Sequence, residues 1–438
     1  MINTRTRYYI LFFIALYGFM KLIMSAYSLS AEFSIGKDFT QEYLMGKAVL
    51  SGLDPYLPLP QLEEFFPLPG RPELFEHPSA HPPISALLGL PFAFLPYLWA
   101  AGAWFSLELI LVLLSCYFLV KWWDTTNIYV KVSLFFFILF CWEPIYAEVF
   151  TGQLNSLLLL LMILCWLCLR GGREIPGGMF LGFAIAIKLF LWPIYILLIM
   201  RRQWHATLVS TISFIVLNLF TLFLMGSDSL LRYYTTTNST VWPIWRGHEA
   251  NFSMWSLGWR IFDGTHGRGD ILTIIPPIYP SVTYAQTLSA AAPIIMLGIG
   301  VFLIMHTKSY DHSYSLAICL SILLSPVAWS HYLILTLLPL TILMKQIFTI
   351  EQLHINVKIK FLSLSTTLLL VSPGYNLSGL SYLFSTIDRS SLSNATIIHM
   401  PFYAGLLTLI PLFALISLIL LIYNFDKLTA TCEQHSLV

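Results

Sequence analysis

Long apolar runs, many of them about the length that crosses a lipid bilayer, recur along the whole chain. A transmembrane helix needs about 20 consecutive, predominantly apolar residues. The runs that fit single spans are Tyr8–Ala26, Leu98–Val120, Val132–Tyr146, Leu154–Leu169, Ala206–Met225, Ala291–Met305 and Phe402–Asn424. The shorter run Phe361–Val371 fits a span where the bilayer thins locally. This pattern predicts an all-α, polytopic membrane protein.

Two other apolar stretches carry polar residues in their middle. Pro176–Met200 contains Lys188, and Ser313–Met344, which is longer than one span, contains Ser325 and His331. We expect each stretch to form a hairpin of two short limbs with a polar bend between them. With each limb counted separately, the chain has about 12 membrane segments.

The distribution of basic residues predicts the orientation, because Lys and Arg gather in short cytoplasmic segments. Placing Arg5 and Arg7 in the cytoplasm also puts Arg170 and Arg201, which flank the first hairpin, on the inner side. Both termini are then cytoplasmic, and segments 27–97, 226–284 and 372–401 become long outer loops. No linker marks a separate soluble domain, so we expect residues 1–438 to form a single transmembrane domain.

Composition and charge support a membrane protein with little exposed polar surface. Hydrophobic residues make up 57% of the chain and charged residues 10%, whereas a soluble domain carries about a quarter charged residues. The net charge of +1 gives no basis for a nucleic-acid partner. Two apolar pieces of the first outer loop, Phe39–Leu50 and Pro83–Phe94, are expected to be helices that lie in the membrane interface. The cysteines lie mostly inside apolar runs, so we expect no disulfides.

Polar residues with chemical potential gather on the outer side of this topology. Asp38 follows the first span, and Gln153 and Asn155 lie in a turn between two later spans. Lys188 and His331 lie at the two hairpin bends. An ionisable side chain at membrane depth is a functional candidate by default. Plainer roles remain open, since Lys188 can extend toward the interface, His331 can be a structural histidine and Asn155 can begin a helix.

These groups suit a substrate with an apolar tail and an anionic head. A lipid phosphate pairs with cations, for which Lys188, His331 and Arg260 are candidates. Asp38 can act as general base toward a sugar hydroxyl while the phosphate departs. One base without a nucleophile implies a single displacement with inversion at the sugar carbon. Aromatic residues near the outer face, Trp329 among them, suit an interface belt first and stacking on sugar rings second.

Short motifs follow one another from about residue 30 to residue 340. They are "DFTQEYLMGKAVLSGLDPY" (Asp38–Tyr56), "HPPISALLGLP" (from His81), "GQLN" (Gly152–Asn155), "AIAIK" (ending at Lys188), "NFS" (Asn251–Ser253) and "SPVAWSH" (Ser325–His331). Each motif alone is weak, but their order and spacing together are specific. On these motifs the chain resembles glycosyltransferase family 87 of the GT-C superfamily. That family includes polyprenol-phosphate-mannose-dependent α-mannosyltransferases.

The resemblance implies a role for each matching residue. Asp38 would be the catalytic base, and Lys188 and His331 would bind the phosphate of the donor, with Arg260 a further candidate from its charge. To the sugar and acceptor pocket we assign Gln153, Asn155, Asn251, Trp329 and His81, the last of which stands where the family commonly has Tyr.

The resemblance also implies the fold and the substrates. We expect a GT-C fold, with the long outer loops packed above the helical core. The donor would be a hexose, above all mannose, on a polyprenyl phosphate, and the acceptor a glycolipid or glycan at the outer face of a bacterial inner membrane. Glucose, galactose and arabinose stay open as sugars that a related member transfers. The chain shows no G-x-G-x-x-G, no P-loop and no D-x-D in its first outer loop. We therefore expect no cofactor and no divalent metal.

Two other functions share these features. A transporter or flippase of lipid-linked sugars would show paired broken helices in corresponding halves, with its site near the membrane midplane. The two hairpins here differ in sequence, and their polar bends are expected to face outward. A polymer ligase would instead use an oligosaccharide on a polyprenyl diphosphate. Sugar transfer in detergent distinguishes an enzyme from a transporter, and the number of phosphates on the accepted donor distinguishes the two enzymes.

Overall fold

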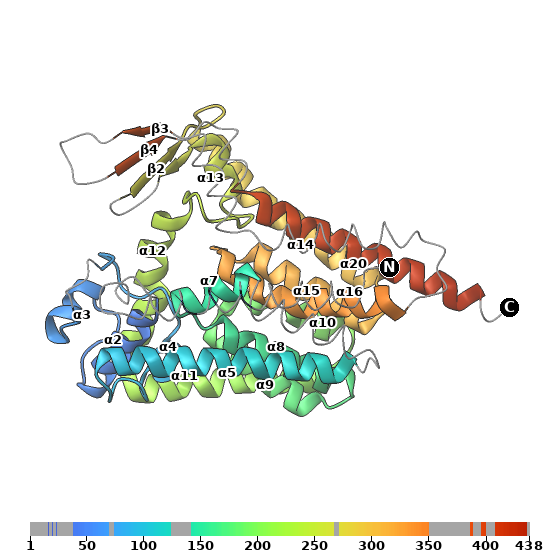
Figure 1. Ribbon diagram of the computed structural model, residues 1–438, viewed down its shortest axis with the longest axis horizontal. Helices are drawn as coiled ribbons and strands as arrows, with labels where there is room; N and C mark the ends of the chain where they lie inside the picture. The colour runs from blue at the N-terminus through green and yellow to red at the C-terminus, as the bar shows by residue number, and fades with distance from the viewer. Residues whose placement is uncertain are drawn as a thin grey trace. The chain divides into compact units, whose positions relative to one another are not determined.

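The computed structural model describes residues 38–69, 74–123, 142–266, 271–349, 386–388, 396–399 and 408–435, together with positions 16, 20 and 23. The expected spans Tyr8–Ala26 and Phe361–Val371, and most of Val132–Tyr146, lie outside these ranges. The described residues are mostly helical (Figure 1) and divide into two compact units. The first unit comprises Met1–Leu189 and His205–Val241, and the second comprises Phe190–Trp204 and Trp242–Val438.

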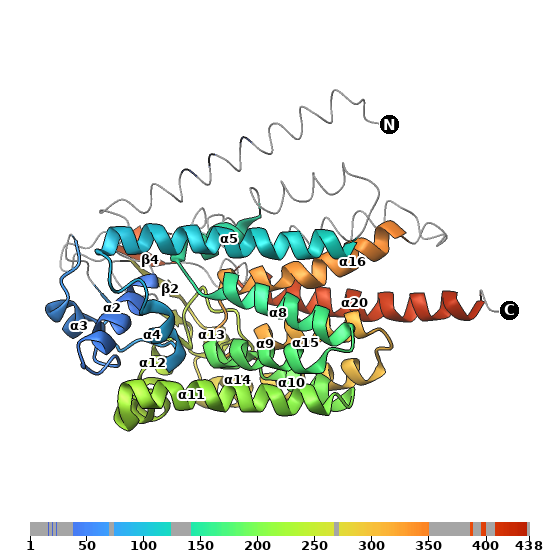
Figure 2. The same cartoon turned by 90° about the horizontal axis from the view of Figure 1, so that it is seen from below.

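The first unit contains a row of long helices in which each helix packs on the next. The helices of this unit are α2 (Phe39–Leu50), α3 (Leu59–Phe65), α4 (Pro83–Gly89), α5 (Tyr97–Trp123), α7 (Glu143–Thr151), α8 (Asn155–Arg170), α9 (Glu174–Ile187) and most of α11 (Trp204–Arg232), with a π-helical turn at Tyr233–Thr237. Helix α8 contacts both α5 and α9, and Figure 2 shows α11 on the far side of α9. Helix α12 (Asn238–Trp245) runs across the boundary of the two units.

Four described helical runs are long and apolar enough to cross a membrane: Tyr97–Trp123, Trp204–Trp245, Val282–His306 and Ile410–Lys427. Each overlaps an expected span. The third begins nine residues before Ala291, an earlier start that the sequence left open. The polar segment that precedes the apolar run is also helical, and the Ser281 side chain caps it by accepting from the Tyr284 N–H. Shorter apolar helices occupy Asn155–Arg170, Glu174–Ile187 and Leu189–Met200.

Two glycines allow α9 and α11 to approach closely. Gly178 and Gly182 lie one helical turn apart on α9. A Cβ atom on Gly182 would lie 2.4 Å from the Ser210 carbonyl oxygen of α11, and one on Gly178 would lie 2.6 Å from the Ala206 carbonyl oxygen. Small residues at such a crossing let two membrane helices pack backbone to backbone. The crossing therefore excludes any larger side chain.

We predict that Gly182→Val destabilises the protein by about 1–3 kcal/mol, because the added methyl groups must push α9 away from α11. The measurement is thermal unfolding of the detergent-solubilised protein. Gly102→Ala is the matched control, since a Cβ on Gly102 of α5 meets nothing within 4 Å. Equal unfolding temperatures for both variants would show that the crossing is looser than described.

A second glycine contact positions the start of α2. Gly46 of α2 faces Gly89 at the end of α4, and a Cβ on Gly89 would lie 2.0 Å from the Glu42 carbonyl oxygen. Both segments are helical and pack directly on one another, and their location in the membrane interface stays a prediction. Helix α2 has the expected bounds, whereas α4 ends at Gly89 instead of Phe94. This contact places the first turn of α2, which follows Asp38, against the rest of the unit.

The second unit is built around α15 (Tyr310–Leu324). Helices α10 (Pro193–Met200), α14 (Val282–His306), α16 (Leu337–Thr349) and α20 (Ile410–His435) all contact it, and every residue from His312 to Leu324 is buried. A helix covered on all sides belongs to the core. Its buried serines avoid unpaired hydroxyls by bonding within the helix, as Ser315 Oγ does to the Asp311 carbonyl at 2.8 Å and Ser321 Oγ to the Ala317 carbonyl at 2.8 Å.

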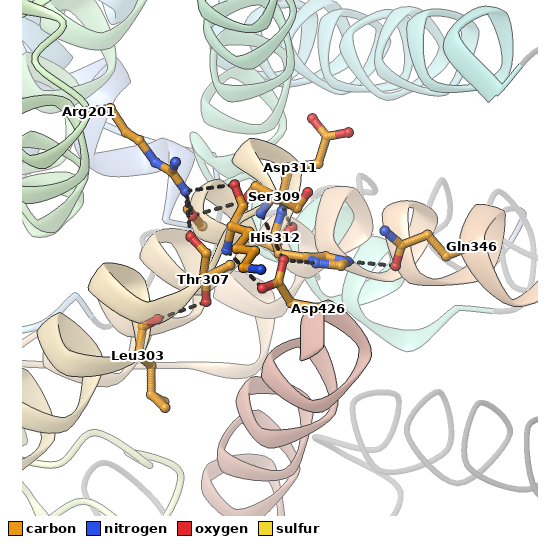
Figure 3. Close-up of polar contacts among 11 residues, drawn as sticks. Arg201, Leu303, Thr307, Ser309, Asp311, His312, Gln346 and Asp426 are labelled. Carbon is orange, nitrogen blue, oxygen red and sulfur yellow. Dashed lines mark hydrogen bonds and ion pairs between the residues drawn. The ribbon is translucent and has the colours of Figure 1, made fainter. Parts of the chain in front are cut away.

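A buried polar cluster fastens α20 to the turn between α14 and α15 (Figure 3). Asp426 accepts hydrogen bonds from the backbone N–H groups of Lys308 and Ser309, both at 2.8 Å, and its Oδ1 lies 2.9 Å from His312 Nδ1. From the other side, Arg201 Nη2 donates to the Thr307 carbonyl at 2.7 Å. Anionic and cationic groups thus match the amides that begin α15 and the carbonyls that end α14.

Both expected hairpins are interrupted where the sequence placed their bends. Helix α9 ends at Ile187, and a short 3-10 segment, Leu189–Leu191, precedes α10. Helix α15 ends at Leu324, and a 3-10 segment, Ser330–Thr336, leads into α16, which packs back on α15. Proline at the first position of α10 favours a helix start there.

A small sheet departs from the all-α expectation. Strands β1 (Thr265–His266), β2 (Ile271–Ile275), β3 (Thr386–Asp388) and β4 (Thr396–His399) pair in the order β1-β2-β4-β3. The β2–β4 pair is parallel and the other two pairs are antiparallel. The sheet joins the segments that the sequence predicts to be the second and third outer loops. Both central strands are rich in Ile and Thr, whose branched side chains favour extended backbone. This composition is a local signal for strands that the expectation of an all-α protein did not use. Helix α13 (Leu257–Phe262) packs nearby on α14.

Candidate active site

Asp38 directly precedes α2, but its carboxylate does not cap that helix. An aspartate in this position usually accepts hydrogen bonds from the first amides of the helix, and here no such bond forms. Instead, Asp38 Oδ2 accepts from Gln153 Nε2 at 2.5 Å, and Oδ1 accepts from Gln41 Nε2 at 3.3 Å. The carboxylate is therefore held by two amides and is directed toward the turn that follows α7.

The neighbours of Asp38 explain how α2 meets that turn. The Asp38 N–H donates to the Thr151 carbonyl at 2.8 Å. The Phe39 ring stacks on Trp104 with centroids 4.8 Å apart, and Trp104 Nε1 donates to the Gly152 carbonyl at 3.0 Å. Gly152 has φ +72°, and a Cβ there would lie 3.0 Å from Phe39 Cβ, so this position requires glycine. The "DF" and "GQ" motifs thus form one local structure.

Lys188 reaches the same place from the end of α9. Its extended backbone (φ −143°, ψ 113°) ends the helix, and the residue is 5% exposed. Lys188 Nζ donates to Gln153 Oε1 at 2.7 Å. A chain of hydrogen bonds therefore runs from the Lys188 ammonium group through the Gln153 amide to the Asp38 carboxylate. Three residues from three separate sequence motifs meet at this point.

The surroundings of Asp38 favour a carboxyl group that can take up a proton. Burial raises the pKa of Asp38 above its ordinary value of 3.8. The hydrogen bond from Gln153 and the charge of His81 lower this pKa, the charge of Glu42 raises it, and the charge of Lys188 lowers it. The net direction is upward. A base with a raised pKa accepts a proton more readily, and the hydrogen bond from Gln153 and the nearby cations act against the rise by favouring the ionised form.

His81 and Glu42 form a buried pair beside Asp38. Glu42 follows Asp38 by one helical turn and is fully buried, and its Oε1 is hydrogen-bonded to His81 Nδ1. The Tyr56 hydroxyl donates to the His81 carbonyl at 2.7 Å and holds this loop. The assignment of His81 to the sugar pocket stays a prediction. Sequence reasoning missed Glu42, although its spacing of four residues from Asp38 on an expected helix could have indicated it.

Asn155, the first residue of α8, holds a second buried carboxylate. Its Nδ2 donates to Glu148 Oε2 at 2.8 Å, and the Ser156 N–H donates to Glu148 Oε1 at 2.7 Å. Burial raises the pKa of Glu148 to about 7, against the Asn155 hydrogen bond and the charge of Lys188. The sequence left open that Asn155 caps this helix, but Leu154 holds the cap position without a side-chain cap hydrogen bond, and Asn155 Oδ1 has no hydrogen-bond partner among the described residues. Its place in the sugar pocket stays a prediction.

Asn251 lies in the second unit, where it organises the loop that carries "SPVAWSH". Its buried Oδ1 accepts from the N–H groups of Ser253 and Ala328 at 3.1 and 3.0 Å, and its Nδ2 donates to the Trp245 carbonyl at 3.1 Å. Ser253 Oγ donates to the Pro326 carbonyl at 3.0 Å. The "NFS" and "SPVAWSH" motifs are therefore fastened together. These contacts support a structural role for Asn251, and direct sugar binding by it stays a prediction.

Arg260 and His331 are both buried in the same unit. Arg260 Nη1 donates to the Asn251 carbonyl at 2.9 Å, and its Nη2 is hydrogen-bonded to Thr408 Oγ1. Burial lowers the pKa of Arg260 to about 10, opposed by a nearby carboxylate. The His331 ring lies 5.1 Å from that of Tyr332. Both residues are positioned by protein contacts, and their role toward a lipid phosphate stays a prediction.

Trp329 is half-buried and belongs to a group of aromatic rings in the second unit. Its ring lies edge-on to Trp245 at 5.6 Å and to His248 at 5.1 Å between centroids. Such rings can stack on a sugar or sit in the membrane interface. Since this residue, Asn251, Arg260 and His331 belong to the second unit and Asp38 to the first, their meeting in one site stays a prediction.

Metal and disulfide chemistry were expected to be absent. Within the described ranges, no group of three or more His, Cys, Asp or Glu side chains is placed to hold a metal ion. Independence of metals and cofactors stays a prediction. The cysteines whose side chains are described, Cys116, Cys165, Cys168 and Cys319, are free thiols.

Comparison with known proteins adds evidence at the level of the family. Residues 80–330, more than half of the chain, match the family described as Glycosyltransferase family 87. A similar curated protein is an α-(1→3)-arabinofuranosyltransferase of Mycobacterium tuberculosis, 26% identical over 171 residues that cover 38% of this chain and 39% of the relative. Another, of the same name, comes from Mycolicibacterium smegmatis and is 29% identical over 146 residues, or 32% and 34% of the two chains. The alignments therefore cover well under half of each relative. No solved structure matches this chain.

Proposed function

Because the chain belongs to glycosyltransferase family 87, we propose that it transfers a sugar from a polyprenyl phosphate to a glycolipid or glycan acceptor. The proposal places Asp38 as the general base. It places the reaction at the outer face of a bacterial inner membrane, in a GT-C fold of about 12 membrane segments. The family that the motifs indicated is confirmed by the family match, which covers residues 80–330 and therefore does not include the Asp38–Tyr56 motif.

The hydrogen-bonded chain Lys188–Gln153–Asp38 is the observation that carries the proposed chemistry. The acceptor hydroxyl gives its proton to Asp38 while its oxygen attacks the anomeric carbon. The bond from that carbon to the phosphate oxygen breaks, and the polyprenyl phosphate leaves with the electron pair. A single attack from the opposite side inverts the configuration at the anomeric carbon.

The departing phosphate needs positive charge, because a leaving group departs more readily when its developing charge is neutralised. We assign this role to His331 and Arg260 of the second unit together with Lys188. Both Lys188 and Arg260 are buried, so their charges act in a medium that screens them less than water does. Gln153, Asn155, Asn251, Trp329 and His81 remain our candidates for the sugar and acceptor pocket.

Two donor sugars follow from different observations. The relatives are named as arabinofuranosyltransferases, which favours a polyprenyl-phosphate arabinofuranose. The resemblance to mannosyltransferases of the same family favours a hexose, above all mannose. Because the arabinofuranosyltransferases align with this chain over a measured stretch of sequence, arabinofuranose is the first donor to test.

The test is single-turnover transfer with the purified protein in detergent, where no second compartment exists. We expect label from a polyprenyl-phosphate sugar to appear in an acceptor extracted from envelope glycolipids, and none to appear when acceptor is omitted. Arabinofuranose and mannose on the same polyprenyl phosphate are compared directly. Binding without transfer would favour the transporter, and transfer only from a diphosphate oligosaccharide would favour the polymer ligase.

A further inference from the structure

Asp38 is held by two glutamines whose positions differ in one respect. Gln153 donates to Oδ2 at 2.5 Å, and its own carbonyl oxygen accepts from the Lys188 ammonium group at 2.7 Å. Gln41 donates to Oδ1 at 3.3 Å, and its carbonyl oxygen is buried without a hydrogen-bond partner among the described residues. The Asp38 carboxylate therefore accepts one hydrogen bond from an amide whose oxygen is bound to a cation, and a second from an amide whose oxygen is not.

The difference has an electrostatic consequence. A cation at an amide oxygen polarises the amide, which makes its N–H groups stronger donors. It also fixes which end of the amide faces the carboxylate, because the oxygen must face Lys188 and the nitrogen must then face Asp38. The turn that carries Gln153 is itself held, since Gly152 accepts from Trp104 Nε1. A 180° rotation of the Gln153 amide would break its hydrogen bonds to both Lys188 and Asp38.

We propose that Lys188 and Gln153 are positioning residues that act in series on Asp38, so that the charge of Lys188 reaches the base through the amide. Oδ2 is thereby fixed as a hydrogen-bond acceptor, and Oδ1, with only the long contact to Gln41, is the oxygen that receives the acceptor proton. This inference rests on the proposed function for the proton step, but the coupling itself is a property of the resting protein.

Other charged groups around Asp38 also influence its pKa. Glu42 lies on the same helix, and His81 precedes α4; these two form a pair of their own. The charge of Lys188 also lowers the pKa of Glu148 of α7, so Lys188 interacts with this second carboxylate as well. Substitutions at Lys188 and Gln153 leave the Glu42–His81 pair in place, so changes at Asp38 can be assigned to the series.

The test measures protonation of Asp38 directly, without any transfer reaction. The full-length protein in detergent is treated with a water-soluble carbodiimide across a pH series. Modification at residue 38, which requires the protonated carboxyl, is then quantified by peptide mass spectrometry. Variants are Lys188→Met, Gln153→Met, the double variant, and Gln41→Met as the matched comparison. Thermal unfolding verifies that each variant is folded.

We expect Lys188→Met and Gln153→Met each to raise the midpoint by about one pH unit or more, because each removes a group that favours the ionised form. Groups acting in series are not additive, so the double variant should match the larger single effect. Gln41→Met should shift the midpoint by less than half as much. Equal shifts for Gln41→Met and Gln153→Met, or additive effects of Lys188 and Gln153, would overturn the proposal.

The transferase assay then separates this inference from the proposed function. If Lys188 acts through Gln153, Lys188→Met should lower kcat and move the acid limb of kcat/KM upward in step with the carbodiimide midpoint. A pure loss of donor affinity, with the midpoint unmoved, would place Lys188 on the donor phosphate alone and refute the series. If the modification midpoints of the variants are non-additive as expected but the protein transfers no sugar, the action of Lys188 through Gln153 is upheld and the proposed transferase activity is refuted.

Discussion

Asp38→Asn is expected to lower kcat for sugar transfer by about 10²–10⁴-fold, the usual contribution of a general base. The amide cannot accept the proton of the acceptor hydroxyl. It keeps the shape of the side chain, and its oxygen can still accept the hydrogen bond from Gln153. Donor binding and thermal stability should therefore remain close to those of the unchanged protein. Single-turnover transfer and donor binding measured on the same preparation provide the comparison.

The pH dependence of the unchanged enzyme follows from the same residue. Only ionised Asp38 can take a proton, so kcat/KM should fall as the pH is lowered through its pKa. Burial raises that pKa above 3.8, so the acid limb should lie at a higher pH than an ordinary aspartate gives. The limb should disappear in Asp38→Asn. Substantial turnover by that variant with the acid limb intact would assign the base to another residue, with Glu42 the first to examine.

Asp426→Ala is expected to destabilise the second unit by about 3–5 kcal/mol, the range found when one partner of a buried charged cluster is removed. The substitution leaves the N–H groups of Lys308 and Ser309 and the Nδ1 atom of His312 without their acceptor. His312 is fully buried, so water does not replace the lost contact. The helix that carries Asp426 would also lose its attachment to the turn before α15 (Figure 3).

Thermal unfolding followed by tryptophan fluorescence measures this loss. Asp426→Asn should cost less than Asp426→Ala, since an amide oxygen still accepts part of the same hydrogen bonds. Asp228→Asn is the control, because Asp228 is exposed and accepts a 3.3 Å hydrogen bond from the hydroxyl of the adjacent Ser227. If Asp426→Ala and Asp228→Asn unfold at the same temperature, the polar cluster does not hold α20 in place.

The bounds of α2, and the helix breaks at Lys188 and after Leu324, could be predicted from the sequence because each depends on local chemistry. At both breaks a polar residue ends the apolar run and a proline follows within a few positions, which disfavours a continuous helix. The four-stranded sheet could not be predicted in this way. Its strands β2 and β4 come from loops more than a hundred residues apart, and neither is long enough to stand out as a strand alone.

For the candidate site, too, the residues could be predicted from the sequence but their arrangement in space could not. Asp38, Gln153 and Lys188 could each be singled out from motifs, because acid, amide and ammonium groups in apolar surroundings are visible in a list of residues. Their arrangement was not visible. The sequence assigned Gln153 to the sugar and Lys188 to the phosphate, whereas the structure joins both to the base. Glu42, buried against His81, was missed because its partner lies in a different segment.

The sequence by itself determined that this chain is an apolar, mainly helical protein with the ordered motifs of its family, since run length and side-chain type are properties of consecutive residues. Only the tertiary structure decided which carboxylate receives a cation-backed hydrogen bond and which helix ends are fastened together. The physical reason is that these interactions act over about 3 Å in space. They join residues such as 38 and 153 or 312 and 426, which lie 115 and 114 positions apart along the chain.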